Sequence, residues 1–425
     1  MAGRATRGGD VGDREETCHD GRVPPFQPFP GIRYAPGLDL ADVTAPPYDV
    51  IDADDRAALV ARSDRNAVLF DLPLESDGDD RYTHAAEVFG GWRADGTLVT
   101  DPEPSFTVYR MTYTDDHGRP ARTLGVIGAL ELSGPDEGRI LPHEHTTKKA
   151  KTDRLDLMRA TCAQLSPVWM LSLAEGLTAL IEPEGPPDAE WADADGVGHA
   201  VWRVTDPDTI AAIAERVGDR PVVVADGHHR YETSLVHRDE RRAAAGPDAE
   251  LASDAFMCLV VELTDDELTV RPIHRLVDGA DADDLEAILP EAGFTVVPDG
   301  RVPPEQVADG TVLRRMDEAG AVAVVDADGA AQLYAVTGTF HVQDLDSARI
   351  ADALGGFDAI TVRFQHGVDH VQAAVAKGDA GAGILLRPAS VAQIEANAHA
   401  GLRMPAKTTF FHPKPRTGVV FRACS

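Results

Sequence analysis

The sequence predicts a mixed α/β protein built from more than one sub-domain. Its 425 residues are too many for one ordinary hydrophobic core, and 43% of them are apolar, enough for about two or three packed units. Segments with the apolar character of strands are interspersed with segments of helical spacing along the whole chain. The clearest example is Pro221–Ala225, an apolar strand that leads within a few residues into a helix expected over Tyr231–Ala244.

Four regions are expected along the chain. Residues 1–24 are rich in Gly, Arg and Asp and are predicted to be a disordered extension. Residues 25–278 are predicted to form the larger, catalytic α/β domain, and residues 279–388 a second, smaller α/β sub-domain. Residues 389–425 add a helix and a polar tail motif that is expected to pack back on the body.

The larger domain is expected to begin with extended chain. Phe26–Pro36 is rich in proline, and two prolines in Ala45–Val50 favour an extended backbone ahead of a tyrosine. Two hairpins are predicted, one joining residues 105–113 to 123–131 and one joining 256–263 to 268–272. Helices are expected over Asp52–Val60, Thr83–Asp95, Leu155–Leu165 and Asp206–Arg216, and further strands over Val168–Leu173 and Trp202–Val204.

The second sub-domain is predicted to consist of short helices and strands that alternate. Its helices are expected over Asp283–Ala292, Asp344–Leu354 and Val368–Lys377, followed in the last region by Ser390–Ala400. Its strands are expected over Thr295–Val297, Ala321–Asp326, Gln332–Val336, Ile360–Phe364 and Gly383–Leu386.

Charge and cysteine usage exclude several classes of protein. The net charge of −31 repels nucleic-acid backbones and anionic membranes, although salt adaptation or genome composition also explains such acidity. The chain has no run of about 18 apolar residues and no signal-peptide pattern at its start. The four cysteines, Cys18, Cys162, Cys258 and Cys424, lack metal-ligand spacing and do not predict a disulfide framework. A cytoplasmic protein without nucleic-acid or membrane partners is therefore expected, while its oligomeric state stays open.

The first candidate site follows the strand at Pro221–Ala225. Asp226, Gly227, His228, His229 and Arg230 lie between this strand and the next predicted helix. The first N–H groups of a helix have no partners within the helix, so they attract anions, and an arginine can bind a phosphate or carboxylate with two hydrogen bonds. The alternative is that the aspartate only caps the helix and that the histidines are solvated.

The second candidate site is the polar stretch from residue 141 to residue 149. It contains His143, Glu144 and His145, followed by Thr146 and Lys148. A carboxylate between two histidines offers a general base whose pKa the neighbouring groups can tune. A solvated loop explains the same composition equally well.

The third candidate is the tail, residues 404–414. Lys407 and Thr408 belong to a Lys-Thr-Thr sequence like part of a P-loop, but the Gly-x-x-x-x-Gly-Lys frame is absent. Phe410 and Phe411 indicate that the tail packs on the body, so a binding role and a structural role both stay open.

Together these segments resemble the family known as domain of unknown function 1015. The resemblance runs from about residue 26 to residue 421. It rests on Ala-Pro-Pro-Tyr-Asp-Val, Pro-His-Glu-His-Thr, Asp-Gly-His-His-Arg-Tyr-Glu-Thr, Arg-Pro-Ile-His-Arg-Leu-Val and the Met-Pro-x-Lys-Thr-Thr-Phe-Phe-x-Pro-Lys tail. Membership of this family implies no activity.

A more distant resemblance is to the ParB/sulfiredoxin fold and its free-serine kinases. Those kinases carry Pro-His-Glu upstream of an Asp-Gly-His-x-Arg turn, and the chain has both in the same order, with 82 positions between Glu144 and Asp226. The resemblance implies that Glu144 takes the proton of the serine hydroxyl and that Asp226 orients the substrate or Mg²⁺. It also implies that His228 and Arg230 hold the phosphates of ATP or ADP.

The leading hypothesis is a nucleotide-dependent kinase of a small hydroxylated amino acid, with free L-serine as the expected substrate. A first alternative is a metal-dependent hydrolase or phosphatase whose ligands are His143, His145, His228, His229 and Asp226. A second is a regulatory module that binds nucleotide without turnover. Under the kinase hypothesis, Glu144 and Asp226 should lie in a common site.

Overall fold

The computed structural model describes residues 25–75, 80–116, 118–134, 137–144, 151–246 and 249–424. The predicted extension, residues 1–24, lies outside these ranges, and so do the candidate residues His145, Thr146 and Lys148.

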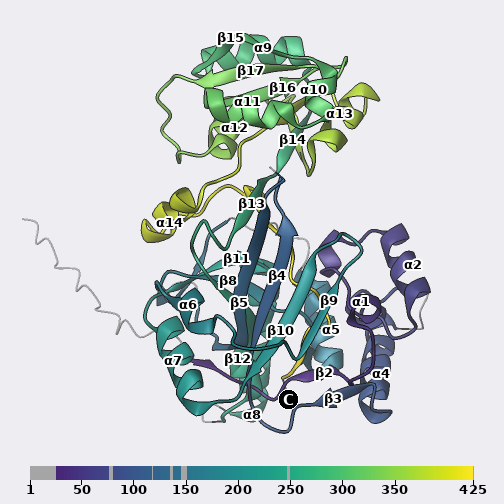
Figure 1. Ribbon diagram of the computed structural model, residues 1–425. Helices are drawn as coiled ribbons and strands as arrows, with labels where there is room; N and C mark the ends of the chain where they lie inside the picture. Colours follow the sequence, from purple (N-terminus) through teal and green to yellow (C-terminus); the bar gives the residue numbers. More distant parts are fainter. Residues whose placement is uncertain are drawn as a thin grey trace, which may run out of the picture.

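The larger of two sheets forms the lower part of Figure 1. It is antiparallel except at two pairs of neighbours, β6 with β11 and β8 with β12. Its strands, in spatial order, are β6 (Ile140–Pro142), β11 (Val222–Asp226), β8 (Val168–Ser172), β12 (Ala255–Glu262), β5 (Pro120–Glu131), β4 (Phe106–Thr114), β10 (Gly198–Val204) and β9 (Ala189–Ala192), with β1 (Phe26–Gln27) beside β5.

The smaller sheet forms the upper part of Figure 1. Its strands, in spatial order, are β15 (Phe294–Val302), β17 (Ala331–Val336), β16 (Ala321–Val325), β19 (Ala382–Leu385), β14 (His274–Asp278) and β18 (Thr361–Gln365). Helices α9 (Ala282–Glu291), α12 (Asp346–Leu354) and α13 (Val368–Ala376) accompany it, and α14 (Val391–His399) lies between the two parts. The predicted helices and strands of this region are present, but β15 ends five residues after the predicted strand Thr295–Val297, and helices α10 (Pro304–Ala308) and α11 (Thr311–Ala319) were not expected. The mixed α/β class is confirmed.

Successive side chains of a strand point to opposite faces of the larger sheet, and an apolar core lies on each face. In β11, Val223 packs into one apolar cluster, while Val222 and Val224 pack into another on the opposite face. The predicted hairpin of β4 and β5 is confirmed, with pairs running from Thr107 and Ile127 to Thr114 and Pro120. The α7 helix (Pro207–Gly218) is capped by the Asp206 side chain, which accepts a hydrogen bond from the Thr209 N–H.

The predicted hairpin of residues 256–263 with 268–272 is wrong. Both edges of β12 are occupied, one by β5 and the other by β8, so the chain cannot pair back on it. Glu267 turns the chain away, because its carboxylate accepts hydrogen bonds from the Leu124 N–H at 2.7 Å and from Arg122 at 3.1 Å. The returning strand, β13 (Thr269–Pro272), pairs instead with β20 (Thr409–His412) of the tail.

The end of the chain closes a third core at one side of the larger sheet. Short pairs tie β2 (Ile32–Tyr34) to β3 (Leu98–Thr100) and β7 (Ala163–Gln164) to β21 (Arg422–Ala423). Phe421 is fully buried there, with its ring centroid 5.4 Å from that of Phe70 and 5.6 Å from that of Phe89 of helix α4 (Arg81–Ala94).

Among the described residues, no helix is both long and apolar enough to cross a lipid bilayer.

Replacing Phe421 by alanine should lower the free energy of unfolding by about 3–5 kcal/mol, because it removes a buried ring from an aromatic cluster. Urea unfolding of the full chain measures the loss. Phe357→Ala is the matched control, since that ring is 45% exposed and its removal should change stability by less than about 0.5 kcal/mol. Equal losses in the two variants would contradict the assignment of Phe421 to the core.

Candidate functional site

The site begins with the parallel pairing of β6 and β11. Ile140, Leu141 and Pro142 lie opposite Val222, Val223 and Val224. Because the two strands run in the same direction, the residues that follow them leave the sheet at the same end. His143 and Glu144 therefore lie beside Asp226, Gly227 and His228, despite the 82 positions between the two carboxylates.

Glu144 binds the tail with both carboxylate oxygens. One oxygen accepts from the backbone N–H of Lys407 at 3.0 Å, and the other from the backbone N–H and the hydroxyl of Thr409 at 2.8 and 2.6 Å. Burial would raise the pKa of this carboxyl, but the hydrogen bond and charge of His143 outweigh burial and lower the pKa to about 2. Glu144 is therefore an ionised, fully bonded group in this structure.

His143 is held on both sides of its ring. Nδ1 donates to the Val224 carbonyl, and Nε2 lies 2.8 Å from the Thr409 hydroxyl and 3.4 Å from Glu144. The Thr409 hydroxyl also lies 2.6 Å from Glu144, so one threonine contacts both the imidazole and the carboxylate.

Helix α8 begins earlier than the sequence suggested. It spans His228–Ala245, so three residues expected in a loop form its first turn. Gly227 precedes it in the left-handed region, with φ +90°, and a Cβ there would lie 2.8 Å from the Arg230 guanidinium. The tight turn thus needs glycine both for its backbone conformation and for the close approach of Arg230.

Asp226 lies between two cations. Its carboxylate is 2.5 Å from the Lys414 ammonium and 2.9 Å from the Arg230 guanidinium. Arg230 also donates to the Ser166 hydroxyl at 3.2 Å and to the Pro167 carbonyl, and it is 8% exposed. Burial raises the pKa of Asp226, but Lys414 and Arg230 outweigh it and hold the pKa well below its usual range.

His228 connects the two carboxylates. Its ring centroid lies 4.9 Å from that of His143, and no described residue is a hydrogen-bond partner of its Nε2. Burial, and then the charge of His143, lowers the pKa of His228 to about 3, with Glu144 and Asp226 opposing the shift. His228 is therefore neutral at physiological pH, and its neighbour His229 follows in the same helical turn.

The tail meets the site through other residues than the sequence indicated. The Lys407 side chain is exposed and only its backbone N–H binds Glu144, while the Thr408 hydroxyl lies 2.8 Å from Ser347. Thr409 and Lys414 make the direct contacts instead. Thr409 is the first residue of β20, whereas Lys407 lies in the preceding turn with φ +60°, so alternation along a strand does not relate the two side chains.

The upper sheet also borders the site. Burial lowers the pKa of Arg275 to about 10, and the charge of Glu144 partly restores it. The ring of His366 lies 4.5 Å from that of Phe410 in the tail. Neither residue was among the candidates expected from the sequence, although Arg275 belongs to the Arg-Pro-Ile-His-Arg-Leu-Val segment of the family pattern.

The described residues contain no group of three or more His, Cys, Asp or Glu side chains that could hold a metal ion. Of the ligands suggested by the metal-dependent alternative, His143 is bound to Val224 and Thr409, and Asp226 to two cations. His145 lies outside the described residues. The donor set that the structure describes thus does not favour a metal centre.

The pKa of His228 predicts acid lability. An unfolded histidine takes up a proton below about pH 6.5, whereas the folded one does so only near pH 3. The stability that a neutral His228 contributes is therefore complete above pH 6.5 and is lost as the pH falls toward 3. Replacing His228 by glutamine should lower the slope of unfolding free energy against pH, between pH 6 and 5, by up to about 1.4 kcal/mol per unit.

Urea unfolding at a series of pH values measures this slope, and His370→Gln is the control because that side chain is 68% exposed. If His228→Gln and the wild type have equal slopes, His228 is not held neutral by the fold.

Comparison with known proteins gives a family and distant structural likenesses. The family model described as Protein of unknown function (DUF1015) matches residues 26–348, and no curated protein matches the chain. A conserved hypothetical protein from Pyrococcus furiosus is 12% identical with a TM-score of 0.35, covering 68% of this chain and 91% of its own.

Two further solved structures have similar scores. A free serine kinase in complex with AMP is 13% identical with a TM-score of 0.35, covering 68% of this chain and 86% of its own. SbnI from Staphylococcus aureus, truncated at its C-terminus, is 14% identical with a TM-score of 0.37, covering 69% and 86%. Likeness at this level carries no argument about a reaction. The family match spans more than half of the sequence, and the chain therefore belongs to the family of proteins of unknown function DUF1015.

Proposed function

We propose that this protein is a nucleotide-dependent kinase of a small hydroxylated amino acid, with free L-serine as the expected acceptor. One observation supports the proposal above the others. Segments from three distant parts of the sequence, around Glu144, Asp226 and Lys414, meet at the N-terminus of an 18-residue helix. Carboxylates, cations and a helix terminus in one place are the parts that phosphoryl transfer requires.

The phosphates of ATP or ADP are assigned to the start of α8. Lys414 and Arg230 carry two positive charges, and Asp226 carries one negative charge. The net charge of these three side chains is therefore +1, so they can attract an anion while Asp226 stays paired. The helix dipole adds to this attraction. Gly227 keeps the turn narrow, which allows a ligand to approach the backbone N–H groups.

Glu144 is assigned as the group that takes the hydroxyl proton of the acceptor. A carboxyl with a pKa of about 2 is a weak base, but a loose phosphoryl-transfer transition state needs little deprotonation of the hydroxyl, so Glu144 orients the hydroxyl and takes its proton late in the reaction. Thr409 and Lys407 occupy its oxygens in this structure. Catalysis by Glu144 therefore requires that the acceptor replace at least one of these tail contacts.

A magnesium site at Asp226 does not fit this arrangement. Both oxygens of the carboxylate are bound to cations, Lys414 at 2.5 Å and Arg230 at 2.9 Å. No step is therefore assigned to Mg²⁺, and the charge of the phosphates is met by the side chains themselves.

A second candidate is a regulatory module that binds nucleotide without turnover. It is favoured by the contacts of Glu144, because both of its oxygens already accept hydrogen bonds from the protein's own tail. Nucleotide binding without product formation would identify this function.

The kinase proposal is tested by incubating the full chain with ATP or ADP and L-serine and following phosphoserine by ³¹P NMR. Glu144→Gln should lower the turnover number by about 10²–10⁴, because it removes the proton acceptor. The control is Thr409→Val, which loosens the same tail contact but keeps the carboxylate, and should change turnover by less than about tenfold. Full activity in Glu144→Gln would rule out the assigned base.

The phosphate assignment is tested by nucleotide titration in a calorimeter. Lys414→Met should weaken ADP binding by about tenfold and reduce its dependence on salt, since one charge contact with the phosphates is lost. Lys407→Met, at an exposed lysine of the same tail, should leave the affinity unchanged. The opposite ranking of the two variants would move the phosphates to the Lys407 end of the tail.

A further inference from the structure

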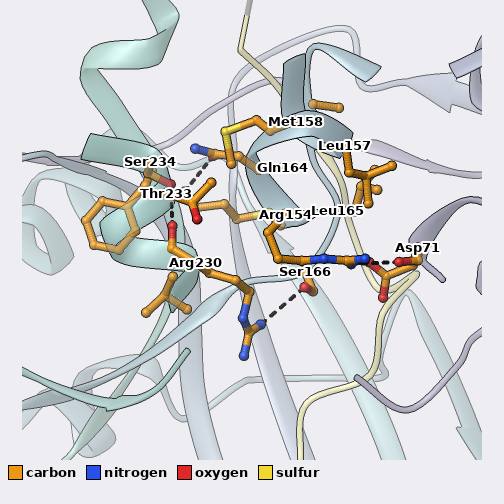
Figure 2. Close-up of a pocket in the computed structure, with 14 residues that line it drawn as sticks. Asp71, Arg154, Leu157, Met158, Gln164, Leu165, Ser166, Arg230, Thr233 and Ser234 are labelled. Carbon is orange, nitrogen blue, oxygen red and sulfur yellow. Dashed lines mark hydrogen bonds and ion pairs between the residues drawn. The ribbon is translucent and has the colours of Figure 1, made fainter. Parts of the chain in front are cut away.

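The place assigned to the phosphates is closed on the side of helix α5 (Lys151–Thr161). The space that Arg230 borders between α5 and α8 is a cavity of about 40 Å³, with room for about one to three water molecules (Figure 2). Arg154 lies against Asp71 there, 3.4 Å from its carboxylate. A nucleotide whose phosphates lie at the start of α8 therefore cannot extend in this direction, whereas the upper sheet borders the site on another side.

A row of side chains connects the phosphates to the upper sheet. The Lys414 ammonium, which pairs with Asp226, lies 4.8 Å from the centroid of the Phe410 ring. The Phe410 ring in turn lies 4.5 Å from the ring of His366, the first residue after β18. Two ring contacts thus separate the phosphate-binding lysine from the end of an edge strand of the upper sheet. A nucleoside diphosphate or triphosphate is long enough to span them.

β18 exposes an apolar surface at this end. Phe364 is 45% exposed, and Val362, on the same face of the strand, is 36% exposed. Among the described Phe, Tyr and Trp side chains, Phe357 is the other exposed one, and it lies ahead of the strand, away from His366. An apolar surface bordered by polar residues is typical of a binding site, so the position of Phe364 beside the site distinguishes it from Phe357.

A buried arginine supports one face of the Phe364 ring. Arg275 is the partner of Phe364 in the pairing of β14 with β18, and its guanidinium carbon lies 4.7 Å from the ring centroid. Arg275 is 4% exposed and donates to the Ile273 carbonyl at 2.6 Å, which fixes it behind the ring. β14 enters the upper sheet from the side of the lower part (Figure 1), and Arg275 lies at its start, near Glu144. The ring is therefore held in place beside the site.

A fixed and exposed ring next to a phosphate site suits a nucleobase. Bases stack on aromatic side chains, and a guanidinium on the far face adds a cation–π contact to such a stack. Burial, and then the charges of Lys407 and Lys414, lowers the pKa of His366, so this ring is neutral at physiological pH and can pack beside a base as well.

We propose that Phe364 is the platform on which the nucleobase stacks when the phosphates of the nucleotide lie at Lys414 and the start of α8. The inference rests on the proposed function in that it completes the nucleotide site of that reaction. Stacking uses the flat face of a base, which all bases have, and not its hydrogen-bonding edge. The platform therefore accepts adenine and guanine alike.

The test is a calorimetric titration of the full chain with ATP, GTP and inorganic tripolyphosphate, which keeps the phosphates and lacks the base. Phe364→Ala should weaken the binding of ATP and of GTP by about tenfold each and leave that of tripolyphosphate unchanged. Phe364→Trp keeps a flat ring and should bind ATP within about threefold of the wild type. The control is Phe357→Ala, which removes an equally exposed ring and should change none of the three affinities.

Three results would overturn the proposal. The first is an unchanged affinity for ATP in Phe364→Ala. The second is an equal loss for tripolyphosphate, because the ring would then act only on the phosphates. The third is an unchanged nucleotide affinity together with a change of oligomeric state in size-exclusion chromatography, which would assign Val362 and Phe364 to a contact between copies of the chain.

The failure of this inference differs from that of the proposed function. If ATP binding depends on Phe364 as expected but no phosphoserine forms, the platform stands and the kinase proposal falls. If phosphoserine forms and the KM for ATP is the same in Phe364→Ala as in the wild type, the kinase proposal stands and the platform falls. If neither nucleotide binds, both fall.

Discussion

The pairing of β6 with β11 is the contact on which the site depends. It aligns only three residue pairs, yet it brings Glu144 and Asp226 to one end of the sheet. The 81 intervening residues do not interrupt this arrangement, since they contain α5, β8, β10 and α7, which belong to the same body. Parallel neighbours need a long connection between them, so a large separation in sequence is a consequence of the pairing and not an obstacle to it.

The tail makes the second connection that defines the site. Glu144 binds residues more than 260 positions later in the chain, and Asp226 binds Lys414. The same tail pairs with β13 and then supplies Phe411 and Phe421 to the cores. A segment that serves both as site lining and as core cannot be removed without unfolding part of the protein. Changes of single side chains are therefore better probes of this site than truncation.

Burial of charge gives the site its chemical character. Asp226, Arg230, Glu144 and His143 all lie largely out of solvent, where an unpaired charge is costly and a paired one is held rigidly. Each carboxylate therefore has a fixed set of partners, and a ligand can enter only by exchanging one of them.

Local pattern in the sequence determined the elements, and tertiary packing determined their partners. Apolar alternation and helical spacing predicted many strands and helices of both sheets, but not β6 or β9. The polar motifs singled out Glu144, Asp226 and the tail as candidates, because these signals depend on residues a few positions apart. The false hairpin at residues 256–272 shows the limit: β12 has the pattern of a strand, but β5 and β8 already occupy its edges. The contacts of Thr409 and Lys414 with the site likewise join residues that are hundreds of positions apart. Such contacts leave no periodic trace in the sequence, so only the tertiary structure decided them.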